Sequence, residues 1–219
     1  MQKIFLFFTA IFSSLLLTAQ VAVRNEPRHH DVFENDYVRI LDVFLAPHDT
    51  TQFHIHNTPS VFVIYTKTAT GSQLKSGQPT KDLSKAGSFW YDSLSTPRIH
   101  RVWNEDSVWF HVMDIELVGG KSHNNLPALE NSLLQLSFNE QQANGYRLQM
   151  KPGENIELPA SAAGYLFLSF GDAGVEYKIN GYTQHRVMKA GHYIWIDPGK
   201  QFSINNGDAD GNFLLLQLK

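Results

Sequence analysis

Three short segments of this 219-residue chain occur twice, in the same order and at nearly the same spacing. The copies share a pattern of apolar and turn residues, and the matching pairs are 45–51 with 150–156, 61–65 with 166–170, and 85–90 with 189–194. A repeat of this kind predicts a duplicated domain, so that both halves should adopt the same fold.

The chain consists of short apolar runs separated by Gly, Pro, Asn and Asp clusters, with few helix signals. This pattern is typical of an all-β sandwich or barrel. Strands are predicted at 37–45, 52–56, 61–66, 88–91, 97–102, 108–117, 132–138, 146–150, 155–158, 165–170, 175–179, 192–196, 201–204 and 213–218.

The N-terminus resembles a secretory signal peptide. Lys3 precedes an apolar stretch at 4–17, and Thr18-Ala19-Gln20 follows as a small-residue cleavage site. We therefore expect residues 1–19 to be removed and the protein to be periplasmic or secreted, without a membrane anchor. An uncleaved N-terminal anchor is the alternative. The predicted order is then a first domain at 20–118, a polar linker at 119–131 and a second domain at 132–219.

Composition excludes several classes of site. The chain has no cysteine, so a metal would need histidine, carboxylate or water ligands, and stability must come from the core. Lys and Arg number 18 against 21 Asp and Glu, a net charge of −3, and no basic run appears. Nucleic acid is therefore an unsuitable partner, and a small molecule is expected instead.

His54 and His56 are the strongest candidate site residues. Side chains two apart on a β-strand point to the same face, so these histidines can reach one metal ion. His100, from a distant predicted strand, is the natural third ligand. The competing interpretation is that they are ordinary surface or hydrogen-bonded histidines. On the repeat register, His54 and His56 match Pro159 and Ser161, so any metal should lie in the first half.

These motifs resemble those of the cupin superfamily. The first cupin motif carries His-x-His, matched by His54 and His56, and the second carries a His with an Asn four residues later, matched by His100 and Asn104. The first-motif Glu falls on Ser60 or Val61, so the carboxylate ligand is missing. The resemblance implies two double-stranded β-helix (jelly-roll) barrels in tandem, a bicupin whose second barrel is degenerate.

The resemblance also implies a function. Three imidazoles would hold a divalent metal, foremost Fe or Zn, with Mn, Ni and Cu as alternatives. Without a carboxylate ligand the ion keeps its full charge, which favours a small anionic organic substrate. Three-histidine cupins include the thiol dioxygenases, so dioxygenase-like chemistry is expected. The alternative is a non-enzymatic cupin that binds a sugar or organic acid beside a vestigial metal site. Cupins often pair, so a homodimer is expected from the resemblance alone.

Several further residues could complete or surround the site. Gln52 and His111 could replace the missing carboxylate ligand, although a supporting or core role is favoured for both. Arg98 shares the strand parity of His100 and could hold an anionic substrate, with a surface ion pair as the simpler interpretation. His29 and His30 could reach the site from the N-terminal arm, but an exposed position is favoured for them.

Overall fold

The computed structural model describes residues 20–119 and 126–219, which form β-strands joined by turns. A short 3-10 helix, η1 (Val23–Asn25), lies near the start. Within these two stretches no helix is long and apolar enough to cross a membrane. The predicted signal peptide and residues 120–125 of the predicted linker lie outside the described residues.

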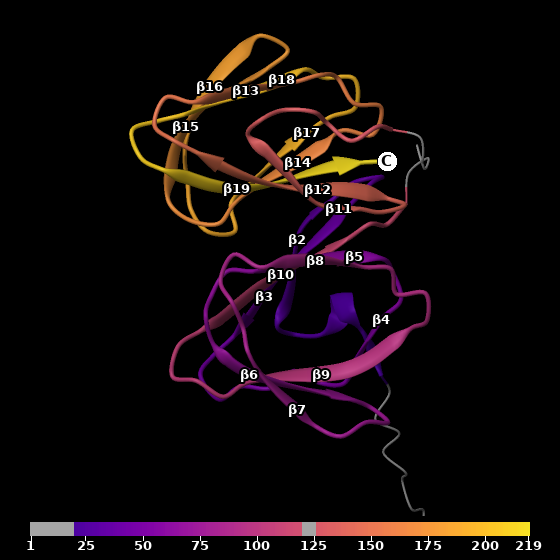
Figure 1. Ribbon diagram of the computed structural model, residues 1–219. Helices are drawn as coiled ribbons and strands as arrows, with labels where there is room; N and C mark the ends of the chain where they lie inside the picture. Colours follow the sequence, from indigo (N-terminus) through magenta and orange to yellow (C-terminus); the bar gives the residue numbers. More distant parts are fainter. Residues whose placement is uncertain (1–19, 120–125) are drawn as a thin grey trace, which may run out of the picture.

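The strands of the first half form two five-stranded sheets (Figure 1). One sheet has the order β1 (Val21–Ala22), β4 (His54–His56), β9 (Arg98–Asn104), β6 (Ala69–Leu74) and β7 (Thr80–Leu83). The other has the order β2 (His29–Glu34), β3 (Arg39–Leu45), β10 (Phe110–Glu116), β5 (Ser60–Ile64) and β8 (Phe89–Asp92). Together they form the first barrel.

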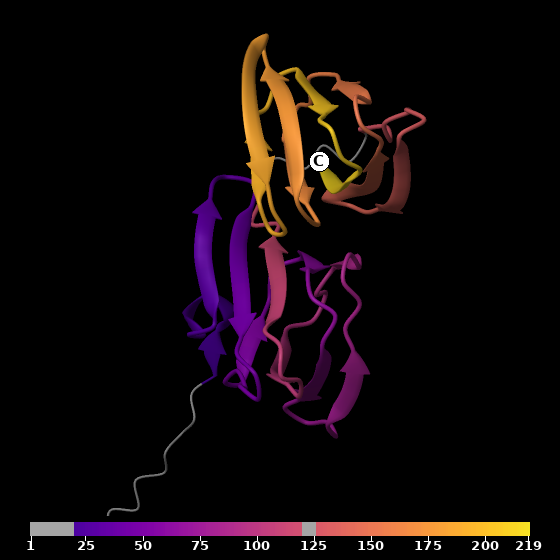
Figure 2. The ribbon, with the colours of Figure 1, turned by 90° about the vertical axis from the view of Figure 1, so that its left-hand side faces the viewer.

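The second half repeats this arrangement. A five-stranded sheet has the order β11 (Leu134–Asn139), β12 (Ala143–Met150), β19 (Gly211–Leu218), β14 (Tyr165–Ser169) and β17 (Tyr193–Ile196). A four-stranded sheet has the order β13 (Asn155–Leu158), β18 (Phe202–Asn206), β15 (Ala173–Ile179) and β16 (Tyr182–Met188). Figure 2 shows the two barrels one above the other.

The two barrels match strand for strand, which bears out the predicted all-β fold and its repeat. Both carry an irregularity near the start of their first long pairing, between Asp31 and Phe33 in one barrel and Leu136 and Phe138 in the other. Strand β1 is the exception, because the second barrel's four-stranded sheet has no strand equivalent to it. The N-terminal arm is therefore an addition to the first barrel.

One matched turn needs a left-handed backbone. Gly153 has φ +74°, and its counterpart His48 has φ +62°. Glycine adopts this region without penalty, whereas a residue with a Cβ does so at a cost. The turn geometry is therefore retained even where the first copy has histidine in place of glycine.

The barrel interiors differ. Aromatic and aliphatic side chains fill the second barrel, including Phe167, Phe202 and Phe213, all at most 1% exposed. In the first barrel the corresponding interior cluster is small and consists of Val43, Leu45, Ile64 and Phe110. The second interior is thus a packed core, whereas the first leaves space for a ligand.

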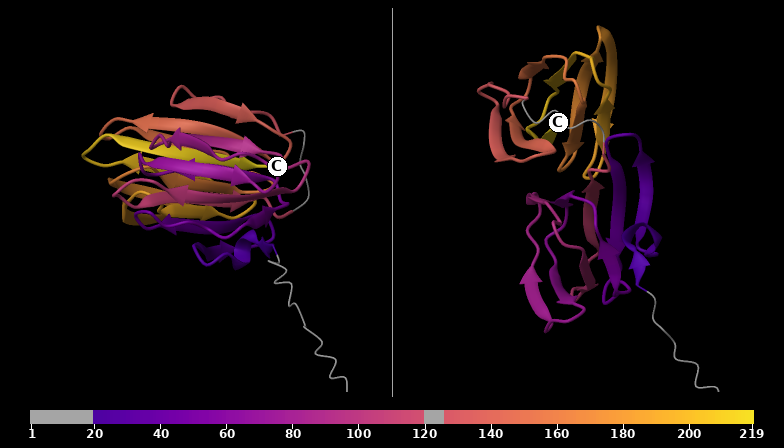
Figure 3. Two further views of the ribbon diagram at one scale, coloured as in Figure 1. Left: turned by 90° about the horizontal axis from the view of Figure 1, so that it is seen from below. Right: turned by 90° about the vertical axis from the view of Figure 1, so that its right-hand side faces the viewer.

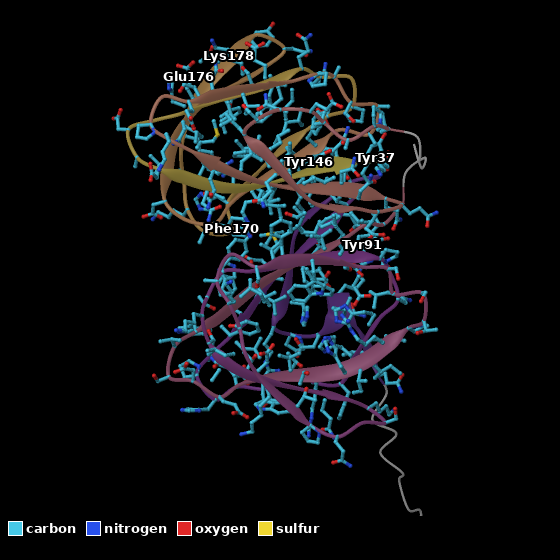
Figure 4. The ribbon with its side chains drawn as sticks, viewed as in Figure 1. Tyr37, Tyr91, Tyr146, Phe170, Glu176 and Lys178 are labelled. Carbon is cyan, nitrogen blue, oxygen red and sulfur yellow. The ribbon has the colours of Figure 1, made fainter. Side chains whose placement is uncertain are left out.

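A third apolar cluster joins the barrels, and the right-hand view of Figure 3 shows the strands of the two halves meeting. It contains Val63 and Ile115 from the first half and Leu166 and Leu216 from the second, all fully buried. Tyr91 and Phe170, labelled in Figure 4, pack at its edge. Strands β5, β10, β14 and β19 therefore pack one face against the other barrel.

Every strand predicted from the sequence overlaps a strand of the structure. The prediction omitted β1, β2, β6, β7 and β16. All four side chains of β7 are exposed, as are most of β16. These strands lack the apolar alternation that identifies a half-buried strand.

Candidate metal centre

His54, His56 and His100 come together inside the first barrel. Strand β4 pairs with β9 so that His54 lies directly opposite His100. His54 and His56 are both buried. The ring centroids of His54 and His100 are 4.7 Å apart, and those of His56 and His100 are 4.9 Å apart. Strand register thus brings the three imidazole rings together, and the centroids of His54 and His56 are likewise 4.9 Å apart.

The His54 ring is held in the tautomer that a metal needs. Its Nδ1 lies 2.9 Å from the carbonyl oxygen of Gln52. Because a carbonyl only accepts, Nδ1 carries the proton and Nε2 keeps the free lone pair. Burial, reinforced by His29 and His56, lowers the pKa of His54 to about 3. The ring is therefore neutral near physiological pH.

His56 and His100 face each other through their Nε2 atoms, which are 3.0 Å apart. Two bare lone pairs repel at this distance, so a proton or a cation must lie between them. Burial first, and then the neighbouring His56 and His54, lowers the pKa of His100 to about 2. The His100 ring is therefore neutral, and the short separation fits either an Nε2–H that one ring donates to the other or a divalent ion that both nitrogens would bind.

The Asp114 carboxylate lies beside the Nδ1 atom of His56. Its Oδ2 lies 3.2 Å from His56 Nδ1, and both side chains are 2% exposed. Neither carboxylate oxygen has a hydrogen-bond partner within the described residues. A carboxylate behind a metal-binding histidine orients the ring and strengthens it as a ligand. Sequence analysis missed Asp114, although an acid within the apolar run of β10 is a recognisable signal.

A fourth histidine, His29, belongs to the same cluster. Its ring centroid is 4.7 Å from that of His54, and the ligand atoms of His29, His54 and His56 lie within 4.8 Å of one another. Its Nδ1 lies 2.8 Å from Glu26 Oε2. The favoured interpretation of His29 as an exposed arm residue is therefore wrong, because it is only 9% exposed. His30, in contrast, is exposed as expected.

The histidines open onto a cavity of about 440 Å³. Its walls are largely apolar, with Val43, Phe62, Ile64 and Val112 among the lining residues. Arg98 also lines it, pairs with Asp92, and lies 5.2 Å from the centre of the Phe62 ring. The ion pair expected from the simpler interpretation of Arg98 is present, and the side chain also lines the cavity.

Gln52, His111 and Asn104 do not line this cavity. Gln52 is exposed and precedes β4, so strand parity does not apply to it, although its carbonyl orients His54. His111 points to the opposite face of β10 from Asp114, where it stacks on Phe44 and bonds Asp42 at 2.7 Å.

Asn104 is instead a structural clamp. Its Nδ2 donates to the carbonyls of Leu45, Ala46 and Val108.

The second barrel has apolar residues at the equivalent positions. Leu158 lies opposite Phe202, just as His54 lies opposite His100. The sequence register, which matched His54 to Pro159, is therefore displaced by one residue. Neutral imidazoles suit Fe, Zn, Ni, Cu and Mn, so the donor set of the first barrel fits a divalent transition metal.

Comparisons with known proteins identify the fold. No family model matches the sequence, and no curated protein sequence does so. Solved structures do match. A cupin 2 conserved barrel domain protein from Leptotrichia buccalis is 10% identical, with a TM-score of 0.56 over 87% of this chain and 88% of that one. YhhW from Escherichia coli is 17% identical, with a TM-score of 0.57 over 89% of each chain.

A salicylate 1,2-dioxygenase from Pseudoaminobacter salicylatoxidans, solved with gentisate, is also similar. It is 10% identical, with a TM-score of 0.62 over 90% of this chain and 75% of that one. At such identities the likeness establishes the fold and leaves the reaction open. The chain therefore has the fold of the cupin superfamily, with two cupin barrels in tandem.

Proposed function

We propose that the protein is a metal-dependent cupin that binds a small anionic organic molecule in its first barrel and acts as a dioxygenase. The observation that carries the proposal is the convergence of His54, His56 and His100, with the Nε2 atoms of the last two only 3.0 Å apart. Neutral imidazoles gathered in one buried place form a donor set that suits a divalent transition metal.

A redox-active divalent ion held there would supply open coordination positions for an organic ligand and for electron exchange with dioxygen. The chain's own groups fix the imidazoles. The Gln52 carbonyl holds His54 and the Asp114 carboxylate lies against His56. No carboxylate from the first cupin motif joins the three histidines, so the positive charge of the ion is left for an anionic ligand.

The cavity supports the ligand class. Its apolar walls and volume of about 440 Å³ suit a small organic molecule. Arg98 Nε is buried and has no hydrogen-bond partner within the described residues, so it can donate to a carboxylate. Phe62 stacks with Trp90 at 5.3 Å and offers an aromatic wall. The gentisate complex of the similar salicylate dioxygenase is consistent with this class.

The test is a calorimetric titration of salicylate and gentisate, used as probes, into iron-loaded and chelator-treated protein. Binding that requires the metal, together with oxygen uptake, is expected. Binding that persists unchanged without metal would favour the non-enzymatic ligand-binding cupin. Absence of any binding to the loaded protein would contradict the proposed ligand class.

Export is a further part of the proposal, and it is supported by the leader-like pattern at 1–19. Expression of the full chain in a bacterium, followed by fractionation and N-terminal sequencing, tests it. A periplasmic protein that begins at Gln20 is expected. A cytoplasmic or membrane-bound protein that retains Met1 would contradict it.

A further inference from the structure

We infer that His29 is a fourth metal ligand, supplied by the N-terminal arm in place of the carboxylate that the first cupin motif lacks. The inference rests on the proposed metal site. His29 is buried and its ring lies 4.7 Å from that of His54. Its Nδ1 donates to Glu26 at 2.8 Å, which leaves Nε2 as the ligand atom.

Glu26 fixes both the ring and the arm. Its carboxylate is buried and accepts from the backbone N–H groups of Arg28 at 2.8 Å and Gln52 at 3.1 Å. A carboxylate that holds the second ring nitrogen of a histidine is the usual support of a metal ligand.

The arm is attached to β4, the strand that carries His54 and His56. β1 pairs in parallel with β4, and Val21 lies opposite His54. Arg28 binds Asp49 through two hydrogen bonds of 2.7 and 2.9 Å. These contacts hold the segment that leads to His29, and His29 itself pairs with Val43 of β3.

The repeat shows that the fold itself does not need histidine here. His29 pairs with Val43 in the first barrel, and Leu134 pairs with Leu148 at the same point of the second. Leu134 packs against the second core. A buried Glu–His pair contributes little to the free energy of unfolding compared with a leucine. Binding of a ligand by His29 therefore explains the presence of Glu26 and His29 better than stability does.

A fourth imidazole narrows the choice of metal. Zinc bound by four protein ligands is usually tetrahedral and closed, whereas a six-coordinate ion such as Fe or Mn would keep two positions for an organic ligand. The arm histidine therefore favours a six-coordinate ion for the proposed chemistry.

The experiment compares wild type, His29→Leu and His30→Leu, where His30 is the exposed neighbour on the same strand. Chelator competition gives the affinity for Co²⁺, and X-ray absorption of the loaded proteins gives the imidazole count. Four imidazoles are expected in wild type and His30→Leu. Three imidazoles and an affinity at least tenfold lower are expected in His29→Leu.

The outcomes separate the inference from the proposed function. Equal affinity and imidazole count in wild type and His29→Leu would overturn the inference alone. Failure of wild type to bind metal would overturn the proposed function and the inference with it. If circular dichroism finds His29→Leu unfolded, Glu26→Gln replaces it, with an expected 10- to 100-fold loss of affinity. Unchanged affinity in that variant would also overturn the inference.

Discussion

Asn104 and Asn206 form the same clamp in the two barrels. Asn104 Nδ2 donates to the carbonyls of Leu45, Ala46 and Val108, and Asn206 Nδ2 donates to those of Met150, Lys151 and Ala209. Each clamp ties the end of one strand to the end of a strand in the other sheet of its barrel and to the loop that follows its own strand. The repeat thus extends to individual hydrogen bonds, although the ligand positions have diverged.

The clamp predicts a stability effect that is separate from the metal. Asn206→Ala leaves three backbone carbonyls without this donor, so we expect a loss of about 2 kcal/mol in the free energy of unfolding. Metal content should not change, because the site lies in the other barrel. Urea unfolding beside Asn205→Ala, an exposed neighbour, checks this. Equal stability of the two variants would contradict the clamp.

The packed second barrel predicts an asymmetry between equivalent positions. Phe202→Ala opens a cavity in a filled core and should cost about 3–5 kcal/mol. His100→Ala enlarges an existing cavity, so the apoprotein should lose much less. Denaturant unfolding of both variants in chelator measures the difference. A comparable loss for the two would mean that the first interior is as tightly packed as the second.

Metal removal should lower thermal stability. An ion present at about 100 times its dissociation constant stabilises the native state by about 2.7 kcal/mol. For a chain of this length the midpoint should then fall by about 5–10 °C on chelation. Differential scanning calorimetry measures the shift, and His54→Ala/His56→Ala is the control that should not respond. An equal response in that variant would place the stabilising ion elsewhere.

Arg98 should control ligand affinity without affecting metal content. Loss of a charge-assisted hydrogen bond costs about 1.5–3 kcal/mol, so Arg98→Ala should weaken carboxylate binding by about 10- to 100-fold. Arg101, which binds Gln73 outside the cavity, provides the control variant Arg101→Ala. Calorimetry on metal-loaded proteins compares them. Equal weakening in both variants would indicate a general electrostatic effect.

The fold was predictable because the core strands are apolar and the repeat fixes their order. β5 reads Ser-Val-Phe-Val-Ile and β14 reads Tyr-Leu-Phe-Leu-Ser, and both are fully buried. The edge hairpins were not predictable, since β7 (Thr-Lys-Asp-Leu) and β16 present most side chains to solvent. Such strands are held largely through backbone pairing, which leaves little trace in the sequence.

The candidate site was predictable only in part. Strand parity predicted that His54 and His56 share one face, and the resemblance to the second cupin motif identified His100 as the third residue. Neither strand parity nor a motif could place His29 at the site. Its distance from His54 depends on the pairing of β2 with β3 and of β1 with β4, which the sequence does not reveal. His111 was considered because it lies on β10, but Phe110, Val112 and Asp114 take the cavity-facing parity of that strand. Parity could therefore have favoured Asp114 over His111.

Metal content of the purified protein tests the central claim most directly. Elemental analysis without chelator would compare wild type with His54→Ala/His56→Ala and with His100→Ala. The account predicts close to one transition-metal ion per wild-type chain and almost none in the double variant, with all proteins folded by circular dichroism. No metal in the wild type after reconstitution, or equal metal in all three, would contradict it.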